Sequence, residues 1–289
     1  MRYLVEHVTR FAYTAPVDLA CHMLHVLPRD LPHQRVLTAD VVSEPVAGRR
    51  SSALDHFGNR VQFLFLDAPH PSFTVTLHAE VEVAFPPAPS PAATPPWEQI
   101  TTARDGLSGQ FRAAEFVFPS PMVALDPGVT DYVAASFPPA RPILAGLLDL
   151  LDRIRRDFSF QPGLTTIATP VSQVFAHRGG VCQDFSHLMI AGLRGLGLPA
   201  RYVSGYLRTH PPPGAEQRRG ADQSHAWVGC WLGAEHGWVD LDPTNNLIVA
   251  DEHVVLGWGR DYGDLSPVRG VILGGGAHTL DVSVDLQAL

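Results

Sequence analysis

The chain contains no lysine, only three cysteines in 289 residues, and no long hydrophobic run. All 21 basic residues are arginines, so the chain has no lysine side-chain amine to which an acyl group could be transferred. The 29 acidic residues give a net charge of −8, and no basic cluster interrupts this acidic balance. Neither nucleic acid nor an anionic membrane surface is therefore an expected partner. No apolar run approaches the ~18 residues that a membrane-spanning helix needs, so we expect a soluble protein.

The cysteines are too few and too scattered for a disulfide framework, and their odd number leaves at least one thiol free. They stand at Cys21, Cys182 and Cys230. The first residues, MRYLVEHVTRF, carry charged side chains where a signal peptide needs an apolar core. A reducing compartment, the cytoplasm, is the expected location.

Residues 1–84 are predicted to form a β-rich N-terminal domain. Apolar and polar residues alternate over 73–83, which is typical of a strand with one face in water. The Gly58-Asn59 pair precedes another apolar alternation and indicates a hairpin turn. Antiparallel sheets packed in a sandwich-like arrangement satisfy this pattern.

The rest of the chain is predicted to hold a proline-rich connector and irregular segment (85–126), a second domain (127–262) and a closing strand segment (263–289). The predicted helices cover 127–137 and 143–158, and the predicted strands cover 201–207, 226–231 and 238–241. The proline- and charge-rich stretch 210–222 is expected to be a loop. The strand near 279–286 is expected to return to one of the sheets, without an assigned partner. The fold class is therefore α+β.

The segment GGVCQDF (179–185) predicts a glycine turn that delivers Cys182 to the first turn of a helix. A helix start presents unpaired N–H groups and partial positive charge, which favour a thiolate. The helix itself is indicated by apolar residues at three- and four-residue spacing up to Gly197. A buried structural cysteine is the alternative, since free thiols are often packed in cores.

A nucleophilic thiol needs a base, and the base needs an orienting acceptor. His225 opens a strand, Asp240 and Asp242 share a face of the next one, and the glycine-bounded turn between the strands indicates a hairpin. Strand parity places His225 and Cys230 on opposite faces, so Cys230 is expected in the core. The register expected for this hairpin favours Asp242 over Asp240 as the residue that orients His225.

Several nearby residues have a structural and a functional interpretation. Asp184 lies in the first helical turn, where a carboxylate is favourable, and is expected to bond a loop. His187 lies about 140° around the helix from Cys182 and is expected to be packed or hydrogen-bonded. Trp227 and Trp238 either wall the cleft or belong to the core. Gln173 and Gln183 are candidate second oxyanion donors, or surface residues.

Three blocks, GGVCQDFSHL, SHAWVGCWL and GWVDLDPTN, resemble the signature blocks of the transglutaminase-like superfamily, in the same chain order. The resemblance implies Cys182 as nucleophile, His225 as base and Asp242 as orienter, on a papain/transglutaminase-like core. The segments YLVEHVTRFAYTAPV, LPRDLPHQ and DHFGNRV resemble the β-rich N-terminal domain that precedes this core in a bacterial subgroup, and GRDYGDLSPVRGVILGGGAHTLDVSV also fits that subgroup.

The resemblance implies a cysteine peptidase or amidase that acts on an amide bond of a peptide or protein, without a cofactor. Three alternatives remain: a protein-glutamine transglutaminase, an arylamine-type acyltransferase, which the segment RGGVC (178–182) also resembles, and a non-catalytic peptide-binding module. A structural metal site is not expected, because the close ligand pairs of zinc sites do not occur. The oligomeric state is not predicted.

Overall fold

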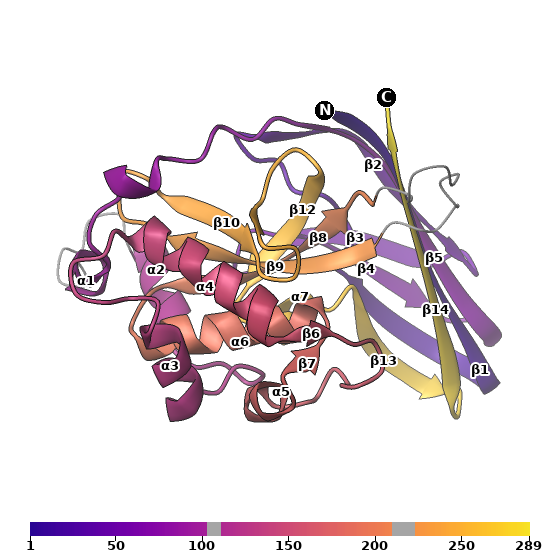
Figure 1. Ribbon diagram of the computed structural model, residues 1–289. Coiled ribbons are helices and arrows are strands. Elements are labelled where there is room, and N and C mark those ends of the chain that lie inside the picture. Colours follow the sequence, from indigo (N-terminus) through magenta and orange to yellow (C-terminus); the bar gives the residue numbers. More distant parts are fainter. Residues whose placement is uncertain (103–110, 210–222) are drawn as a thin grey trace, which may run out of the picture.

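The first strand, β1 (Arg2–Leu24), organises the N-terminal part of the molecule, because every strand of one antiparallel sheet either pairs with it or with its neighbour. The structure is a computed structural model that describes residues 1–102, 111–209 and 223–289 (Figure 1). The sheet also contains β2 (Gln34–Glu44), β3 (Arg49–Leu54), β4 (Arg60–Leu66), β5 (His70–Val83), β13 (Val268–Gly274) and β14 (His278–Ala288).

This sheet is folded across its strands. The pairing of β1 shifts register between Ala12 and Val17, and its two halves have different neighbours: β5 and β14 beside the first half, β4 and β13 beside the second. Pro16 lies at the register shift of β1, and Pro45, Pro69 and the glycines 274–276 lie where β2 passes to β3, β4 to β5 and β13 to β14. Proline cannot donate to a ladder and glycine tolerates unusual dihedrals, so these residues suit the points where strand pairing is interrupted.

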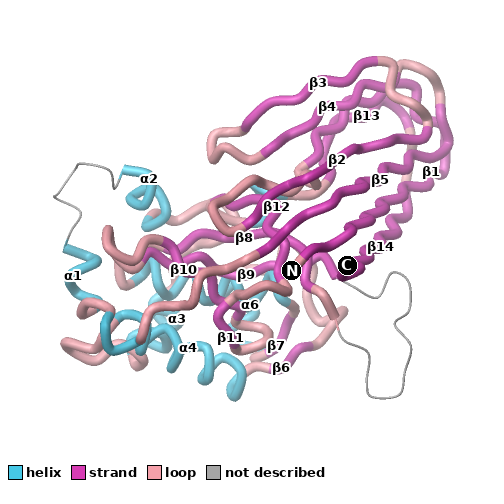
Figure 2. Tube along the Cα trace, turned by 90° about the horizontal axis from the view of Figure 1, so that it is seen from above, coloured by secondary structure: helices cyan, strands magenta, loops and turns pink. Residues whose placement is uncertain are grey.

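The two halves of the folded sheet face each other around one apolar core (Figure 2). The His22 ring, from the second half of β1, stacks on Phe73 of β5 with ring centroids 4.2 Å apart. The predicted sandwich-like N-terminal domain is thus formed by one sheet folded on itself. Alternation also holds as predicted, since Phe73, Val75 and Leu77 are buried and the residues between them are not.

The second part of the fold is an antiparallel sheet in the order β11-β10-β9-β8-β12. Its strands are β8 (Ala200–Leu207), β9 (Gln223–Trp231), β10 (Trp238–Asp242), β11 (Leu247–Ile248) and β12 (His253–Gly259). The predicted hairpin is confirmed, because β9 and β10 pair in a register that sets Asp240 opposite Gly229. The predicted loop 210–222 lies outside the described residues.

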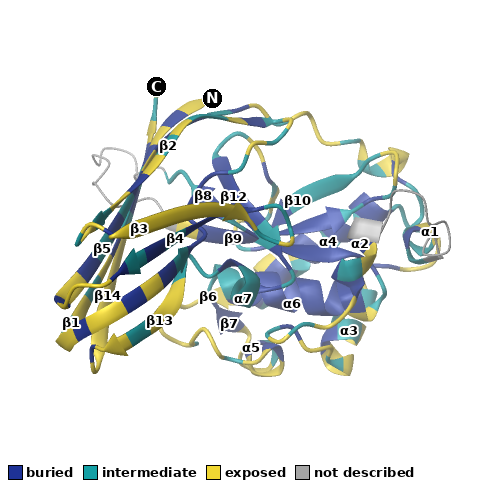
Figure 3. Ribbon diagram, turned by 180° about the vertical axis from the view of Figure 1, so that it is seen from behind, coloured by how far each residue is buried: buried dark blue, intermediate teal, exposed yellow. Residues whose placement is uncertain are grey.

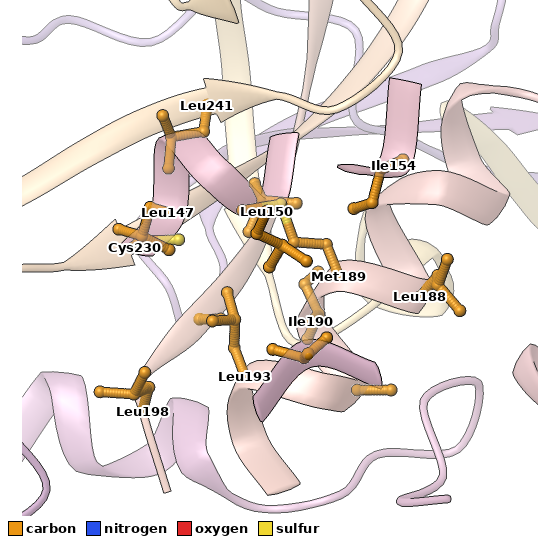
Figure 4. Close-up of a cluster of buried hydrophobic side chains, with 14 of the residues drawn as sticks. Leu147, Leu150, Ile154, Leu188, Met189, Ile190, Leu193, Leu198, Cys230 and Leu241 are labelled. Carbon is orange, nitrogen blue, oxygen red and sulfur yellow. The ribbon is translucent and has the colours of Figure 1, made fainter. Parts of the chain in front are cut away.

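Helices cover one face of this sheet, with α6 (Cys182–Gly195) at the centre of the core (Figure 4). The other helices are α3 (Pro127–Ala134), α4 (Ile143–Asp157), α5 (Val171–His177) and α7 (Tyr262–Leu265). Leu188, Met189 and Leu193 of α6 pack against α4 and against the sheet residues Val228 and Cys230. The predicted helices at 127–137 and 143–158 are confirmed with slightly earlier ends, and α6 is buried almost throughout (Figure 3).

The connector between the two parts contains short helical turns rather than an entirely irregular path. They are η1 (Pro91–Ala93), α1 (Trp97–Thr102), α2 (Phe111–Ala114) and η3 (Glu115–Val117). A small parallel pair, β6 (Ser159–Phe160) and β7 (Gly179–Gly180), lies next to α6. Among the described residues, the structure has no helix of the length and hydropathy required to span a membrane.

The two parts share apolar and polar contacts through β8 and β12. Tyr206, Val254 and Leu256 belong to the core of the folded N-terminal sheet. The Gln34 side chain donates to the carbonyl of Val255 and accepts from its N–H, both at 2.7 Å. The Asn59 side chain makes the equivalent pair of hydrogen bonds with the backbone of Trp258. The side-chain amides of Gln34 and Asn59 therefore pair with β12 as the backbone of a neighbouring strand would.

Candidate active site

Cys182 is the first residue of α6, and its delivery there depends on Gly180 and Asp184. A Cβ on Gly180 would lie 2.5 Å from the Asp184 carboxylate, so only glycine allows this close approach. That carboxylate accepts from the N–H of Val181 at 2.8 Å and from the Thr165 hydroxyl at 2.6 Å. The prediction that Asp184 is structural and bonded to a loop is confirmed. The Cys182 side chain is partly exposed.

His225 and Asp242 lie together on the sheet next to the start of α6. His225 Nε2 is 2.8 Å from Asp242 Oδ2, and both side chains are almost fully buried. The other ring nitrogen, Nδ1, is buried without a conventional partner among the described residues. Because Nε2 is bonded to Asp242, Nδ1 is the ring nitrogen left for the Cys182 thiol, whose charge acts on this ring.

The electrostatics of the pair favour an imidazolium beside a carboxylate. Burial alone would lower the pKa of His225, but the hydrogen bond with Asp242 and the nearby charges of Asp242 and Cys182 outweigh burial and raise that pKa to about 10. Burial would likewise raise the pKa of Asp242, but hydrogen bonds from His225, His253 and Asn245 hold it well below its usual range. A charged His225 is thus the stable form at neutral pH.

Asp242 is held by two further side chains that the sequence patterns did not identify. Asn245 Nδ2 donates to Asp242 Oδ2 at 2.7 Å, while Oδ1 accepts from the backbone N–H groups of Thr244 and Asn245. The Asp-Pro-Thr-Asn sequence has turn chemistry that could have indicated this arrangement. His253 Nε2 lies 3.4 Å from the same Oδ2. No local signal predicts His253, because β12 is separated from β10 by two strands in the sheet order and only the tertiary fold brings its first residue to Asp242.

Asp240, the alternative orienter, has a different environment. Its Oδ2 accepts from Trp227 Nε1 at 3.0 Å, and its Oδ1 lies 3.6 Å from Arg201 Nη2. Trp227 is fully buried and packs against the ring of His225, with centroids 6.2 Å apart. A Cβ at Gly205 would lie 2.3 Å from the Trp227 ring, so glycine makes room for the indole.

The remaining candidates take structural positions. Cys230 is buried in the helix-facing core, as predicted. His187 accepts from the N–H of Tyr262, and burial lowers its pKa to about 4, which confirms a packed, hydrogen-bonded histidine. Gln183 donates to the carbonyl of Ile167, and Gln173 is exposed on α5. No second oxyanion donor is therefore assigned.

His225, Asp242 and His253 could also hold a metal ion by geometry alone, since their ligand atoms lie within 4.8 Å of one another. All three side chains are buried, and both histidines already direct Nε2 at Asp242 Oδ2. Hydrogen bonding explains the cluster without an ion, and we assign no metal to it.

Two protein-family models match the chain. The bacterial transglutaminase-like N-terminal region matches residues 3–82, which hold strands β1 to β5 of the folded sheet, and the transglutaminase-like superfamily matches residues 133–243. The second range contains Cys182, His225 and Asp242.

Similar proteins cover nearly the whole chain. An uncharacterized protein of Mycobacterium tuberculosis is 39% identical over 292 residues, covering 99% of this chain and 92% of the relative. A protein-glutamine gamma-glutamyltransferase of Pseudomonas aeruginosa is 31% identical over 116 residues, which are 37% of this chain and 17% of that protein. A solved structure named “Putative Cysteine Protease”, from Cytophaga hutchinsonii, has the same fold, with a TM-score of 0.77 and 20% identity over 100% of this chain and 91% of that one.

Proposed function

Since this chain belongs to the transglutaminase-like superfamily and carries its bacterial N-terminal region, we propose that it is a thiol-dependent acyl-transfer enzyme with Cys182, His225 and Asp242 as its triad. Its substrate would be an amide bond in a peptide or protein, and hydrolysis would be its main reaction. The observation that carries the proposal is the buried bond of 2.8 Å from His225 to Asp242, beside a partly exposed thiol at a helix start.

In the proposed reaction, Cys182 and His225 form a thiolate–imidazolium pair, and Asp242 fixes the ring and stabilises its charge. The thiolate attacks the amide carbonyl, and the backbone N–H of Cys182 at the helix start donates to the oxyanion. His225 gives its proton to the leaving amine as the C–N bond breaks, which leaves a thioester on Cys182. His225 then accepts a proton from water, whose oxygen attacks the thioester; the C–S bond breaks, which releases the acid and restores the thiolate of Cys182 beside protonated His225.

The second candidate reaction is transfer of the acyl group to an amine instead of water. It is favoured by the 31% identity to the protein-glutamine gamma-glutamyltransferase of Pseudomonas aeruginosa over 116 residues. The steps up to the thioester are the same, and only the acceptor differs. Incubation with a peptide mixture, with and without a small primary amine, separates the two by mass spectrometry: new free acids indicate hydrolysis, and amine adducts indicate transfer.

The reactivity of Cys182 tests the proposal, and the chain supplies its own control thiol. At pH 6, iodoacetamide should alkylate Cys182 at least about tenfold faster than the exposed Cys21, because in the proposed mechanism His225 accepts the proton of Cys182 and activates its sulfur as a nucleophile. Mass spectrometry of timed digests reads both rates in one sample. His225→Ala should abolish the difference, whereas Cys21→Ala should leave the Cys182 rate and any peptide turnover unchanged.

Equal rates at both cysteines, with peptide turnover that survives Cys182→Ala, would contradict the proposed enzyme. Specific peptide binding without turnover would then favour a non-catalytic module.

A further inference from the structure

A cavity of about 770 Å³ lies on the face of the core sheet opposite α6. Arg201 and Asp240 point into it, whereas their strand neighbours Ala200, Tyr202 and Leu241 face the helical core. The N-terminal region, the connector over 85–89 and strands β10 and β12 supply its walls. None of the three proposed triad residues lines this cavity.

The centre of the cavity wall is a guanidinium held between two indoles. The Arg201 Cζ atom lies 4.3 Å from the ring centroid of Trp238 and 3.9 Å from that of Trp258. Its side chain is 9% exposed. Since two indole rings lie within 4.3 Å of Cζ, the N–H groups at the edge of the guanidinium are the ones suited to a ligand, and they match a planar acceptor such as a carboxylate.

Three nitrogen atoms of residues that line the cavity are buried without hydrogen-bond partners among the described residues: Arg201 Nε, His33 Nε2 and His236 Nε2. None of the three is open to the cavity in this structure, and Arg201 Nε lies against Gly229. Because unpaired buried polar atoms are costly, these side chains gain by turning toward an acceptor that enters the cavity. The carboxylates of the lining already have partners. Asp240 is bound by Trp227 and Arg201, and Glu115 lies 2.9 Å from His56.

From this arrangement we propose that the cavity binds a small carboxylic acid with an aromatic body. The carboxylate accepts hydrogen bonds from Arg201, His33 and His236, and the aromatic body packs against the rings of Trp238, Trp258 and Phe85. The volume is within the range of about 300–1,000 Å³ that is typical of small-molecule sites. Arginine and the two histidines supply donors, and no unpaired acid in the described lining opposes the anion.

This site is separate from the proposed thiol chemistry. Trp227 lies between them, because it packs against His225 and donates its Nε1–H to Asp240 at the cavity wall. Binding in the cavity therefore requires no reaction at Cys182, and it can be tested whether or not Cys182 is catalytic.

The probe is 2-naphthoate, with 2-naphthamide as the uncharged control of the same shape. We expect the full-length protein to bind one naphthoate by calorimetry, with a change in tryptophan fluorescence, and to bind the amide at least about tenfold more weakly. His33→Ala and His236→Ala should each weaken naphthoate binding at least about fivefold. His177→Ala, at an exposed position on α5, should not change it, and neither should Cys182→Ala.

Three outcomes would overturn the inference. The first is the absence of naphthoate binding at millimolar concentration, and the second is equal binding of acid and amide. The third is binding that Cys182→Ala removes while His33→Ala and His236→Ala leave it intact, since the ligand would then occupy the thiol site.

Discussion

At the scale of single residues, Asp242 does more than orient one histidine. It accepts from His225, from Asn245 and from two backbone N–H groups, with His253 close to the same oxygen. A carboxylate with this many donors stays ionised at low pH. The stable negative charge in turn keeps His225 protonated well above its usual pKa.

Asp242→Asn should therefore shift the alkaline limit of activity. In the wild type, the pKa of His225 is raised to about 10. If His225 is the general acid that we propose, its imidazolium persists through pH 8–9 and activity should be lost as pH rises through about 10. Without the carboxylate, burial dominates and lowers the pKa of His225, so the alkaline decline should move to lower pH. The pH dependence of kcat/KM measures this shift.

The same raised pKa has a consequence for stability. The His225–Asp242 pair should stabilise the fold fully below the ordinary histidine pKa of about 6.5 and lose its contribution as pH rises through about 10. The difference in unfolding free energy between wild type and Asp242→Asn should thus shrink above that pH.

For the activity measurement, an alkaline limit that Asp242→Asn leaves in place would show that a group other than His225 controls it.

At the scale of elements, α6 is positioned by close contacts with α3 as well as by its apolar stripe. A Cβ at Gly192 would lie 2.2 Å from Val133 Cγ2 and 3.2 Å from the carbonyl of Val129. Glycine therefore lets the two helices approach closely. Periodicity in the sequence predicts the helix but not this requirement, because the partner helix lies some sixty residues earlier in the chain.

Gly192→Ala should lower the free energy of unfolding by about 1–3 kcal/mol, since overpacking outweighs the helix preference for alanine. Gly128→Ala is the matched control on α3, where a Cβ meets only the Asp126 carboxylate and the Phe175 ring at 3.3–3.6 Å. The control should be neutral or slightly stabilising. Urea unfolding of both variants gives the comparison, and equal effects would show that α3 and α6 can separate at no cost.

At the scale of the whole molecule, the folded sheet and the core cannot be treated as independent units. The C-terminal strands β13 and β14 both pair with β1, so the two ends of the chain lie in one sheet (Figure 1). The core residues Tyr206, Val254 and Leu256 are buried by the N-terminal sheet. We therefore expect one cooperative unfolding transition for the protein.

Gln34→Ala should lower the midpoint temperature of this single unfolding transition without dividing it into two. The substitution removes both hydrogen bonds to the backbone of Val255. The Val255 N–H is then left unpaired, whereas its carbonyl still accepts from the N–H of Arg29 at 3.2 Å, so we expect a cost of about 1–3 kcal/mol. Gln287→Ala, at an exposed position of β14, should change stability by less than about 0.5 kcal/mol. Calorimetry that resolves two separate transitions would contradict this coupling.

The sequence by itself determined the α+β class, the alternating strands, the helix that begins at Cys182 and the hairpin that carries His225 and Asp242. These features follow from periodicity and turn chemistry, which act over a few residues. Only the tertiary structure placed Asp242 beside His225 and engaged Asp240 with Arg201 and Trp227. Strand parity gives both aspartates the same face and register only favours Asp242, so the choice depends on side-chain contacts with residues of β8 and β9. For the same reason His253, the folding of the N-terminal sheet and the cavity around Arg201 have no local signal.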